Sequence, residues 1–364
     1  MTTQSKPRRD RIELFVLYVV SIVVAIVIAA VLVNTSGGSW SKAVEAMMNG
    51  AFKNPGRWGE TLRRAAPLLI VATGSTIAAK AGIINIGQEG QVLVGAAGAA
   101  FIMTKIQPGS PVLMVAGVAL GMVTGAAWAG ISAWLYYWRR IPVVLSSLLL
   151  VYLSSQIVGY TMTRKFLLLE VVVGSPNRIQ QSAKTAVNSR LGIMEIFGNN
   201  VPLSVPVAVL VALGVAYLLA HSVWGFRLKM LGLNPRTAQR AGVSHVYFGT
   251  MALLTSGAAA GLAGSLMLAT GESNYRMSSG FSSSVGWDGL LVALVARNNP
   301  YAAVPVALAF ASLHTGSNFL AAAGVESVLV DVIRGLLVLA LFVPPAVSEL
   351  RQKRRALAQM TERA

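Results

Sequence analysis

Four polar side chains interrupt a long apolar stretch in the first third of the sequence: Asn85, Gln88, Glu89 and Gln91. Hydrocarbon strongly disfavours an amide or a carboxylate unless the group faces protein, a cavity or water. Such groups could hydrogen-bond a polar solute that crosses a membrane, or they could hold a broken helix in place. A solvated loop between two helices is the simpler alternative. We call residues 85–91 the first polar break.

A second polar break, residues 280–289, resembles the first. The motif GQEG at residues 87–90 corresponds to GWDG at residues 286–289, and each is followed by a run of aliphatic and small residues. A solvated loop gives no reason for this recurrence, which therefore indicates two related halves. Shortened, glycine-interrupted segments at matching places in two halves are typical of a transporter's pathway. Trp287 and Asp288 thus join the candidate pathway residues.

The two acids of these breaks, Glu89 and Asp288, have a functional and a structural interpretation. As functional groups they could hydrogen-bond a polar substrate. As structural groups they could each cap the short helix that follows their break, because a carboxylate stabilises the N-terminal end of a helix. We favour the structural role, and the residues alone leave both open.

The composition is that of an integral membrane protein. Hydrophobic residues make up 55% of the 364 residues and charged residues 12%, and the mean hydropathy is +0.64, outside the usual range of soluble chains. The apolar runs are about 20 residues long, which suits helices crossing a hydrocarbon core rather than the short alternating strands of a membrane barrel. We expect an all-α, polytopic transmembrane helical bundle.

Membrane topology accounts for the net charge of +17 better than nucleic acid does. Lys and Arg gather at the ends of apolar runs and in loops, and both termini are basic, which predicts cytoplasmic N- and C-termini and an even number of crossings, about ten. The first break then precedes an outward crossing and the second an inward one, so the repeats would be inverted. The chain has no cysteine, and its three histidines are too scattered for a metal site.

We expect one transmembrane domain, 1–364. Its parts are a first span with an external segment (11–61), a first repeat half (62–163), an external loop (164–202), a cytoplasmic segment (222–247), a second repeat half (248–347) and a basic cytoplasmic tail (348–364). In the second half, Gly257, Gly261 and Gly264 are spaced so that helices can approach closely.

The cytoplasmic stretch 226–243 mixes apolar and basic residues. The Asn-Pro pair at 234–235 predicts the start of a short helix. The stretch could dock a cytoplasmic partner, or it could be a basic loop lying against anionic lipid. Docking is favoured, because Leu233, Ala238 and Ala241 would have nothing to pack on in a solvated loop.

Three separate stretches resemble a known family, the membrane-spanning permeases of bacterial ABC importers for simple sugars, branched-chain amino acids and nucleosides. They are AGIINIGQEGQVLVGAA at 81–97, GLNPRTAQRAGV at 232–243 with SGAAAGLAGSL at 256–266, and GWDGLLVALVARNNP at 286–300. They occur in the expected order between about residues 62 and 345, and the nucleoside-type branch is the most similar.

The resemblance implies a fold like that of the ten-helix vitamin B12 importer permease. It also implies a transport subunit rather than an enzyme, with no cofactor of its own because ATP is bound by partner subunits. The implied setting is the bacterial cytoplasmic membrane, with a second permease subunit, paralogous or identical, two ATP-binding subunits and a substrate-binding lipoprotein as partners. By position, the segments around Asn85 and Asp288 would flank the translocation route. The residues that would couple to the ATPase are Asn234, Pro235, Arg236, Arg240, Ala241 and Gly242.

One stretch departs from the family pattern. Nucleoside-type relatives usually carry a Glu after the fourth span and later an Asn in the fifth, where residues 141–156 offer Ser146, Ser147 and Tyr152. This departure affects the choice of substrate more than the assignment to transport. The alternative function is an ion-coupled secondary transporter, in which inverted repeats and broken helices also occur and which would couple through Glu89 or Asp288.

Overall fold

The computed structural model describes residues 8–53, 55–170 and 180–320, together with part of residues 332–351. Most of the predicted basic tail, residues 348–364, lies outside the described residues, as does much of the last predicted span.

The chain divides into two compact units. Unit 1 comprises Met1–Arg57 and Ser312–Ala364, and unit 2 comprises Trp58–Ala311. Unit 1 has a small core of its own, in which Ala29, Val33 and Leu320 are buried. Its helices in the described residues before unit 2 are α1 (Arg8–Thr35), α2 (Trp40–Met48) and a π-helical turn (Asn49–Lys53).

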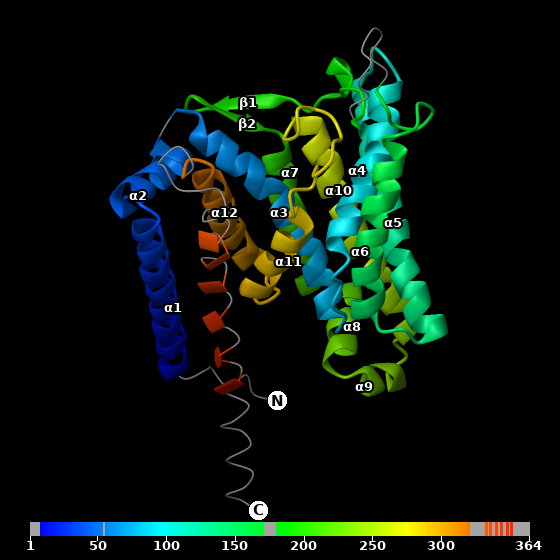
Figure 1. The fold of residues 1–364 in the computed structure, drawn as a ribbon. Helices are drawn as coiled ribbons and strands as arrows, with labels where there is room; N and C mark the ends of the chain where they lie inside the picture. Colours follow the sequence, from blue (N-terminus) through cyan, green and yellow to red (C-terminus); the bar gives the residue numbers. More distant parts are fainter. Residues whose placement is uncertain are drawn as a thin grey trace, which may run out of the picture. The chain divides into compact units, whose positions relative to one another are not determined.

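Unit 2 carries both polar breaks (Figure 1). The helices that lie wholly or mainly in it are α3 (Arg57–Lys80), α4 (Gln88–Lys105), α5 (Pro111–Arg139), α6 (Val143–Thr161), α7 (Ser204–His221), α8 (Val223–Leu233), α9 (Pro235–Arg240), α10 (His245–Thr270), α11 (Val285–Val295) and α12 (Pro300–Ser317). The first break thus spans the end of the α3–α4 connection and the first turn of α4, and the second spans the end of the α10–α11 connection and the first turn of α11.

Five helices in the described part of the chain are long and apolar enough to cross a membrane: α1 from Phe15 onward, α5, α6, α7 and α10. This confirms the all-α, polytopic membrane bundle. Helix α3 is less apolar because Glu60, Arg63 and Arg64 lie near its start, and α11 is apolar but short. The total of ten crossings and the inverted repeat stay predictions.

Three helices of unit 2, α4, α5 and α10, pack against one another. A Cβ atom on Gly261 of α10 would lie 2.2 Å from the carbonyl oxygen of Gly121 on α5, and one on Gly95 of α4 would lie 2.3 Å from Gly261 Cα. Such backbone contact is possible only without side chains. The predicted close approach of helices at Gly257, Gly261 and Gly264 is therefore confirmed. It fixes the position of α4 relative to α10.

Local chemistry sets the ends of these helices. Ser110 Oγ accepts a hydrogen bond from Leu113 N at the start of α5, and Pro111 occupies the first helical position. Ser244 caps α10 in the same way. Gly271 ends α10 with a φ of 76°, a left-handed conformation that costs glycine little. The connection between α10 and α11 begins there.

The predicted external loop, residues 164–202, contains a hairpin that the sequence analysis did not predict. Strands β1 (Ile193–Ile196) and β2 (Asn199–Pro202) pair antiparallel, with Ile196 opposite Asn199. The two turn residues, Phe197 and Gly198, both have positive φ (49° and 71°), as a tight hairpin turn of this type requires. The hairpin lies at the opposite end of unit 2 from α9 (Figure 1).

Candidate functional site

The first polar break folds into a closed hydrogen-bonded network. Asn85 Nδ2 donates to Gln91 Oε1 (3.0 Å) and to Ser256 Oγ on α10 (3.1 Å), and Gln91 Nε2 donates back to Asn85 Oδ1 (3.1 Å). The backbone N–H of Gly87 also donates to Asn85 Oδ1 (3.1 Å), a local turn that leads the chain into α4. Asn85 and Gln91 are buried, so protein groups replace water as their partners.

Gln88 attaches the start of α4 to α10. Its Nε2 donates to Ser256 Oγ at 2.7 Å, and the side chain is fully buried. Its Oε1 has no hydrogen-bond partner among the residues that the structure describes. An unsatisfied buried amide oxygen costs free energy.

Glu89 bridges the two polar breaks. Its Oε1 accepts a hydrogen bond from Ser282 Oγ, and its Oε2 accepts one from the backbone N–H of Gly286 (2.7 Å). Gly286 lies in the first turn of α11, where N–H groups have no partner within the helix. The residue in the N-cap position, Ser284, makes no side-chain cap. The carboxylate of Glu89 therefore supplies the cap that α11 lacks.

The N-terminal turns of α4 and α11 meet at this point. A Cβ atom on Gly286 would lie 2.3 Å from both Glu89 N and Glu89 Cα, so only glycine allows the approach. Both helix N-termini carry partial positive charge, and a carboxylate between them is stabilised by both. Glu89 lies in the first turn of α4, as the structural interpretation of this residue expects, and its carboxylate caps α11 in addition.

Asp288 and Trp287 lie in the first turn of α11 and are half-buried. Asp288 is close enough to Glu89 for the two carboxylates to interact electrostatically. Gly286, whose N–H bonds to Glu89, lies two residues before Asp288 in the sequence. The acids of both breaks therefore lie at the N-terminus of α11. The structure thus brings the two breaks into direct contact.

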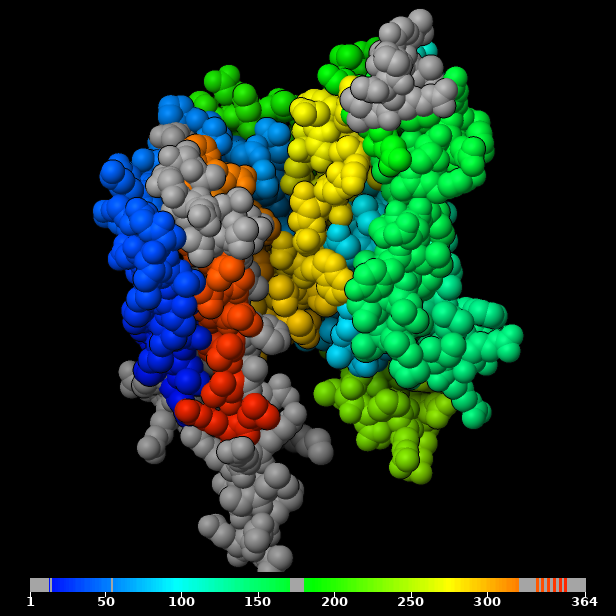
Figure 2. All heavy atoms as spheres, in the orientation of Figure 1, coloured from blue at the N-terminus to red at the C-terminus, as the bar shows by residue number. Residues whose placement is uncertain are grey.

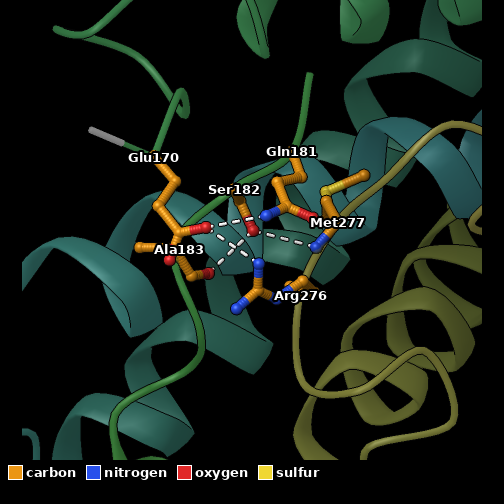
Figure 3. Close-up of polar contacts among 6 residues, drawn as sticks. All are labelled: Glu170, Gln181, Ser182, Ala183, Arg276 and Met277. Atoms are coloured by element: carbon orange, nitrogen blue, oxygen red, sulfur yellow. Dashed lines mark hydrogen bonds and ion pairs between the residues drawn. The ribbon is translucent and has the colours of Figure 1, made fainter. Parts of the chain in front are cut away.

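A polar cluster, drawn in Figure 3, ties the external loop to the α10–α11 connection. Arg276 Nη1 and Gln181 Nε2 both donate to Glu170 Oε2 at 2.8 Å. Two hydrogen bonds join Ser182 and Met277: Ser182 N donates to the Met277 carbonyl, and Met277 N donates to the side-chain Oγ of Ser182, each at 2.8 Å. We call these five residues the clasp. Figure 2 shows the connection, in yellow, at the surface of this face.

Glu272 is a second charged residue of the α10–α11 connection, two residues after the end of α10. Its Oε2 is buried and has no hydrogen-bond partner in the described part of the chain. Burial raises the pKa of this carboxyl to about 7. The positive charges of Arg64 and Arg63 on α3 lower the pKa, and the negative charge of Glu60 raises it, but burial has the largest effect. The carboxyl therefore changes charge close to neutral pH.

The predicted start of a short helix at residues 234–235 is confirmed. Asn234 Oδ1 accepts hydrogen bonds from Arg236 N and Thr237 N (both 3.1 Å), and Pro235 occupies the first position of α9. This cap fixes the angle between α8 and α9. Figure 2 shows the two helices, in yellow-green, projecting from the end of unit 2.

One side of α9 packs inward and the other is open to the surroundings. Ala238 is fully buried against unit 2, whereas Leu233 is 87% exposed. Leu233 is thus an exposed apolar side chain that is followed in the sequence by the basic residues Arg236 and Arg240. The six residues that the sequence analysis proposed for coupling to the ATPase are all exposed: Asn234, Pro235, Arg236, Arg240, Ala241 and Gly242.

The end of α8 touches the chain that leads into the first polar break. A Cβ atom on Gly232 would lie 2.3 Å from the carbonyl oxygen of Lys80 and 2.9 Å from Gly82 N. Gly82 itself has a φ of 78°, a backbone conformation that glycine adopts readily and other residues adopt only at a cost. Two backbones are therefore in direct contact, immediately before Asn85 on one side and before α9 on the other.

Sequence reasoning missed Ser256 and Ser282, the hydroxyl partners of the two breaks, because isolated serines in apolar helices and glycine-rich turns carry no spacing signal. On α6, Ser146 and Ser147 are buried and Tyr152 is exposed. No group of three or more metal-binding side chains occurs within the described ranges.

Comparison with known proteins identifies the family. The model of the branched-chain amino acid transport system permease component matches residues 59–342. A glucose ABC transporter permease of Haloferax volcanii is 30% identical over 77% of this chain and 74% of its own length. A guanosine ABC transporter permease of Bacillus subtilis is 27% identical, over 88% of this chain and 90% of its own. No solved structure matches the chain.

A nucleoside ABC transporter permease of Lactococcus lactis is 25% identical over 93% of both chains. The resemblance found in the three sequence stretches is therefore confirmed, including its nucleoside-type character, and the ion-coupled alternative is not favoured. An ABC permease works with ATP-binding and substrate-binding partners and is not itself an enzyme. The chain belongs to the family of branched-chain amino acid transport system permease components, as a multi-pass membrane subunit of an ABC importer.

Proposed function

We propose that this permease admits nucleosides or related simple sugars. Relatives that extend over most of the chain are named for guanosine, nucleosides and glucose. These solutes share hydroxyl-rich sugar rings, which hydrogen-bond to polar side chains and stack weakly on aromatic ones. The substrate would be delivered by an external binding lipoprotein.

The ATP-binding subunits would dock on α8 and α9. Leu233 offers an apolar side chain of the kind that a partner's groove buries, and Arg236 and Arg240 add positive charge around it. The rigid Asn234 cap would let α9 move as one body with α8. A docking interface would bury the exposed leucine.

The observation that carries the proposal is the contact of Gly232 with Lys80 and Gly82. Because backbone meets backbone there, a displacement of α8 cannot be absorbed by side-chain rotation. It would pass to the connection that leads into Asn85 and α4. ATP-driven movement of the docking segment would therefore reach the first polar break within a few residues.

The polar breaks would act as a joint beside the translocation route. In the conformation described here most of their side chains are buried and bonded to protein, so they would position the helices that line the route more than they would hold the solute. The residues assigned to this joint are Asn85, Gln88, Glu89, Gln91, Trp287 and Asp288.

The assembly would contain this chain, a second permease that is identical or paralogous, and two ATP-binding subunits. It would lie in the bacterial cytoplasmic membrane with both termini on the cytoplasmic side, as the basic ends of the chain suggest. The clasp and the β1–β2 hairpin would then face the lipoprotein.

Transport assays on the reconstituted assembly test the function. Proteoliposomes that contain the permeases, the ATP-binding subunits and the lipoprotein should take up radiolabelled guanosine or glucose only with ATP, and ionophores that collapse proton and sodium gradients should not change the initial rate. Uptake that persists without ATP and disappears with an ionophore would contradict the proposal.

Cross-linking tests the docking surface. The chain has no cysteine, so Leu233→Cys introduces a single thiol that should cross-link to a cysteine on the ATP-binding subunit. Phe197→Cys is the matched control, since Phe197 is 99% exposed on the hairpin at the opposite end. Equal cross-linking at both positions would show that α8 and α9 are not the docking site.

A further inference from the structure

A basic pocket of about 510 Å³ lies at the α8 end of unit 2. Lys80 from the end of α3, Lys229 from α8 and Arg297 from the α11–α12 turn line it, together with Asn298 and Asn299, and no acidic residue contributes to its wall. The site joins three cations from three separate elements. Because all three side chains are cationic, an anion in the pocket would be attracted by each of them.

The turn that brings Arg297 to the pocket is held in an unusual conformation. Arg297 and Asn298 have φ values of 56° and 53°, which non-glycine residues adopt at some cost. Asn298 N donates to the carbonyl of Ala293 (2.8 Å), and Asn299 Oδ1 accepts from Tyr301 N at the start of α12 (3.0 Å). The pocket therefore also borders the positive N-terminal end of an 18-residue helix.

Lys80 and Lys229 are close enough to repel each other electrostatically. Neither lysine forms an ion pair within the described residues. A bound anion would remove this repulsion and would accept hydrogen bonds from the guanidinium and the amides. A phosphate group has the charge and the number of oxygens to do so.

A second cavity, an apolar groove of about 90 Å³, lies between α3, α7 and α12 and shares no lining residue with the basic pocket. Its wall is formed by aliphatic side chains, among them Leu69, Val209 and Leu308. On α3 its last lining residue, Leu69, precedes Lys80 by eleven residues, which is about 16 Å along a helix. On α7, Val209 lies seven residues before Ala216 of the basic pocket, which is about 10 Å along a helix. On α12 the groove residues follow the pocket residues, so both helices place the groove on the same side of the pocket.

We propose that unit 2 binds an anionic phospholipid, with the phosphate in the basic pocket and an acyl chain in the groove. An anionic phospholipid has a negatively charged headgroup for the basic pocket and an acyl chain for the apolar groove. Basic pockets between membrane helices on the cytoplasmic side accept anionic headgroups in this way. A free phosphate would occupy the pocket but would leave the groove unexplained.

The lipid has a position from which it could influence transport. Lys80 is the residue whose carbonyl oxygen meets Gly232, and Lys229 lies one turn earlier on the same helix as Gly232. A headgroup bound to both lysines joins α3 to α8 at the contact that transmits the movement of the docking segment. Anionic lipid would therefore stabilise the contact between α8 and the first polar break.

The test compares lipids on the intact transporter in nanodiscs. After transfer into phosphatidylcholine, native mass spectrometry should find phosphatidylglycerol retained by the wild type. The triple variant Lys80→Gln/Lys229→Gln/Arg297→Gln should retain it on the order of 100-fold less, because each basic residue near a headgroup contributes severalfold to affinity. The control variant Arg139→Gln/Arg140→Gln/Lys165→Gln removes the same charge from exposed positions outside the pocket and should retain the lipid.

A second pair of variants tests the groove independently of the cations. Val209→Trp fills the groove and should reduce phosphatidylglycerol retention at least tenfold, whereas Leu210→Trp, at an exposed neighbouring position outside the groove, should not. If inorganic phosphate at millimolar concentration protects the complex from heating as well as phosphatidylglycerol does, the ligand is free phosphate. Equal retention of phosphatidylglycerol and phosphatidylcholine by the wild type would overturn the proposal. So would equal retention of phosphatidylglycerol by Val209→Trp and Leu210→Trp.

Discussion

The carboxylate of Glu89 gives the sharpest test of how the polar breaks work. It accepts hydrogen bonds from Ser282 Oγ and Gly286 N and is 7% exposed. In Glu89→Ala, Gly286 N–H becomes a buried donor without a partner, which costs about 1–3 kcal/mol, and α11 loses a charge at its N-terminus worth about 0.3–2 kcal/mol. Removing the buried charge returns part of this. We expect a net loss of about 2–4 kcal/mol in the free energy of unfolding.

Glu89→Gln separates hydrogen bonding from charge. The amide oxygen can still accept from Gly286 N, and the amide nitrogen can donate to Ser282 Oγ, because a hydroxyl also accepts. Only the interaction of the charge with the two helix ends is lost, so the expected loss is about 0.5–2 kcal/mol. Ser282→Ala should cost about 1 kcal/mol, and its effect should largely vanish when Glu89 is already Ala, because the two side chains are partners.

The assay is reversible unfolding of the permease in mixed micelles, followed by helix content, with ATP-driven uptake measured on the same variants. Stability and uptake should fall together in the order wild type, Gln, Ala. If Glu89→Ala keeps its full stability but loses uptake, the carboxylate contacts solute or a coupling ion and the capping argument is refuted. If Gln is as unstable as Ala, charge rather than hydrogen bonding holds α11.

Three other changes have expected outcomes. Gly261→Ala should lower the free energy of unfolding of the bundle by about 1–3 kcal/mol in the same assay, because its Cβ would lie 2.2 Å from a backbone oxygen of α5. Gly214→Ala is the control and should be neutral or stabilising, because a Cβ at this position would have no neighbouring atom within 4 Å. Gly232→Val should lower uptake per ATP hydrolysed on the order of tenfold, with assembly of the transporter, checked by co-purification, unchanged; normal uptake would refute the transmission route. The pKa of Glu272 is raised to about 7, so the folded state binds its proton more tightly and stability should fall as pH rises from about 4.5 through 7; Glu272→Gln should remove this dependence and be more stable than wild type at pH 8.

Local features of the fold could be predicted from the sequence. Asn234 and Pro235 marked the start of α9, because a cap and a helix-starting proline act within one turn. A short helix was expected after the second polar break, and α11 begins within that break, at Val285. The glycine spacing of α10 predicted close helix packing. In each case the physical cause lies within a few residues of the pattern.

Long-range partners could not be predicted in the same way. Nothing near Glu89 shows that its carboxylate bonds to Gly286, because that contact depends on how α4 packs on α11. The hairpin was missed because its turn places Phe197, rather than a glycine or an asparagine, at positive φ. A non-glycine residue in that conformation is fixed by the pairing of the flanking strands, which a local pattern does not contain.

The bridge made by Glu89 limits how the joint can move. If α4 and α11 separated during transport, Gly286 N–H and the buried carboxylate would both lose their partners in an apolar surrounding, at a cost of several kcal/mol. Movement that keeps the two N-termini together avoids this cost. The two helices should therefore move as one body, held at one end by the clasp through the α10–α11 connection and driven at the other by Gly232 against Gly82.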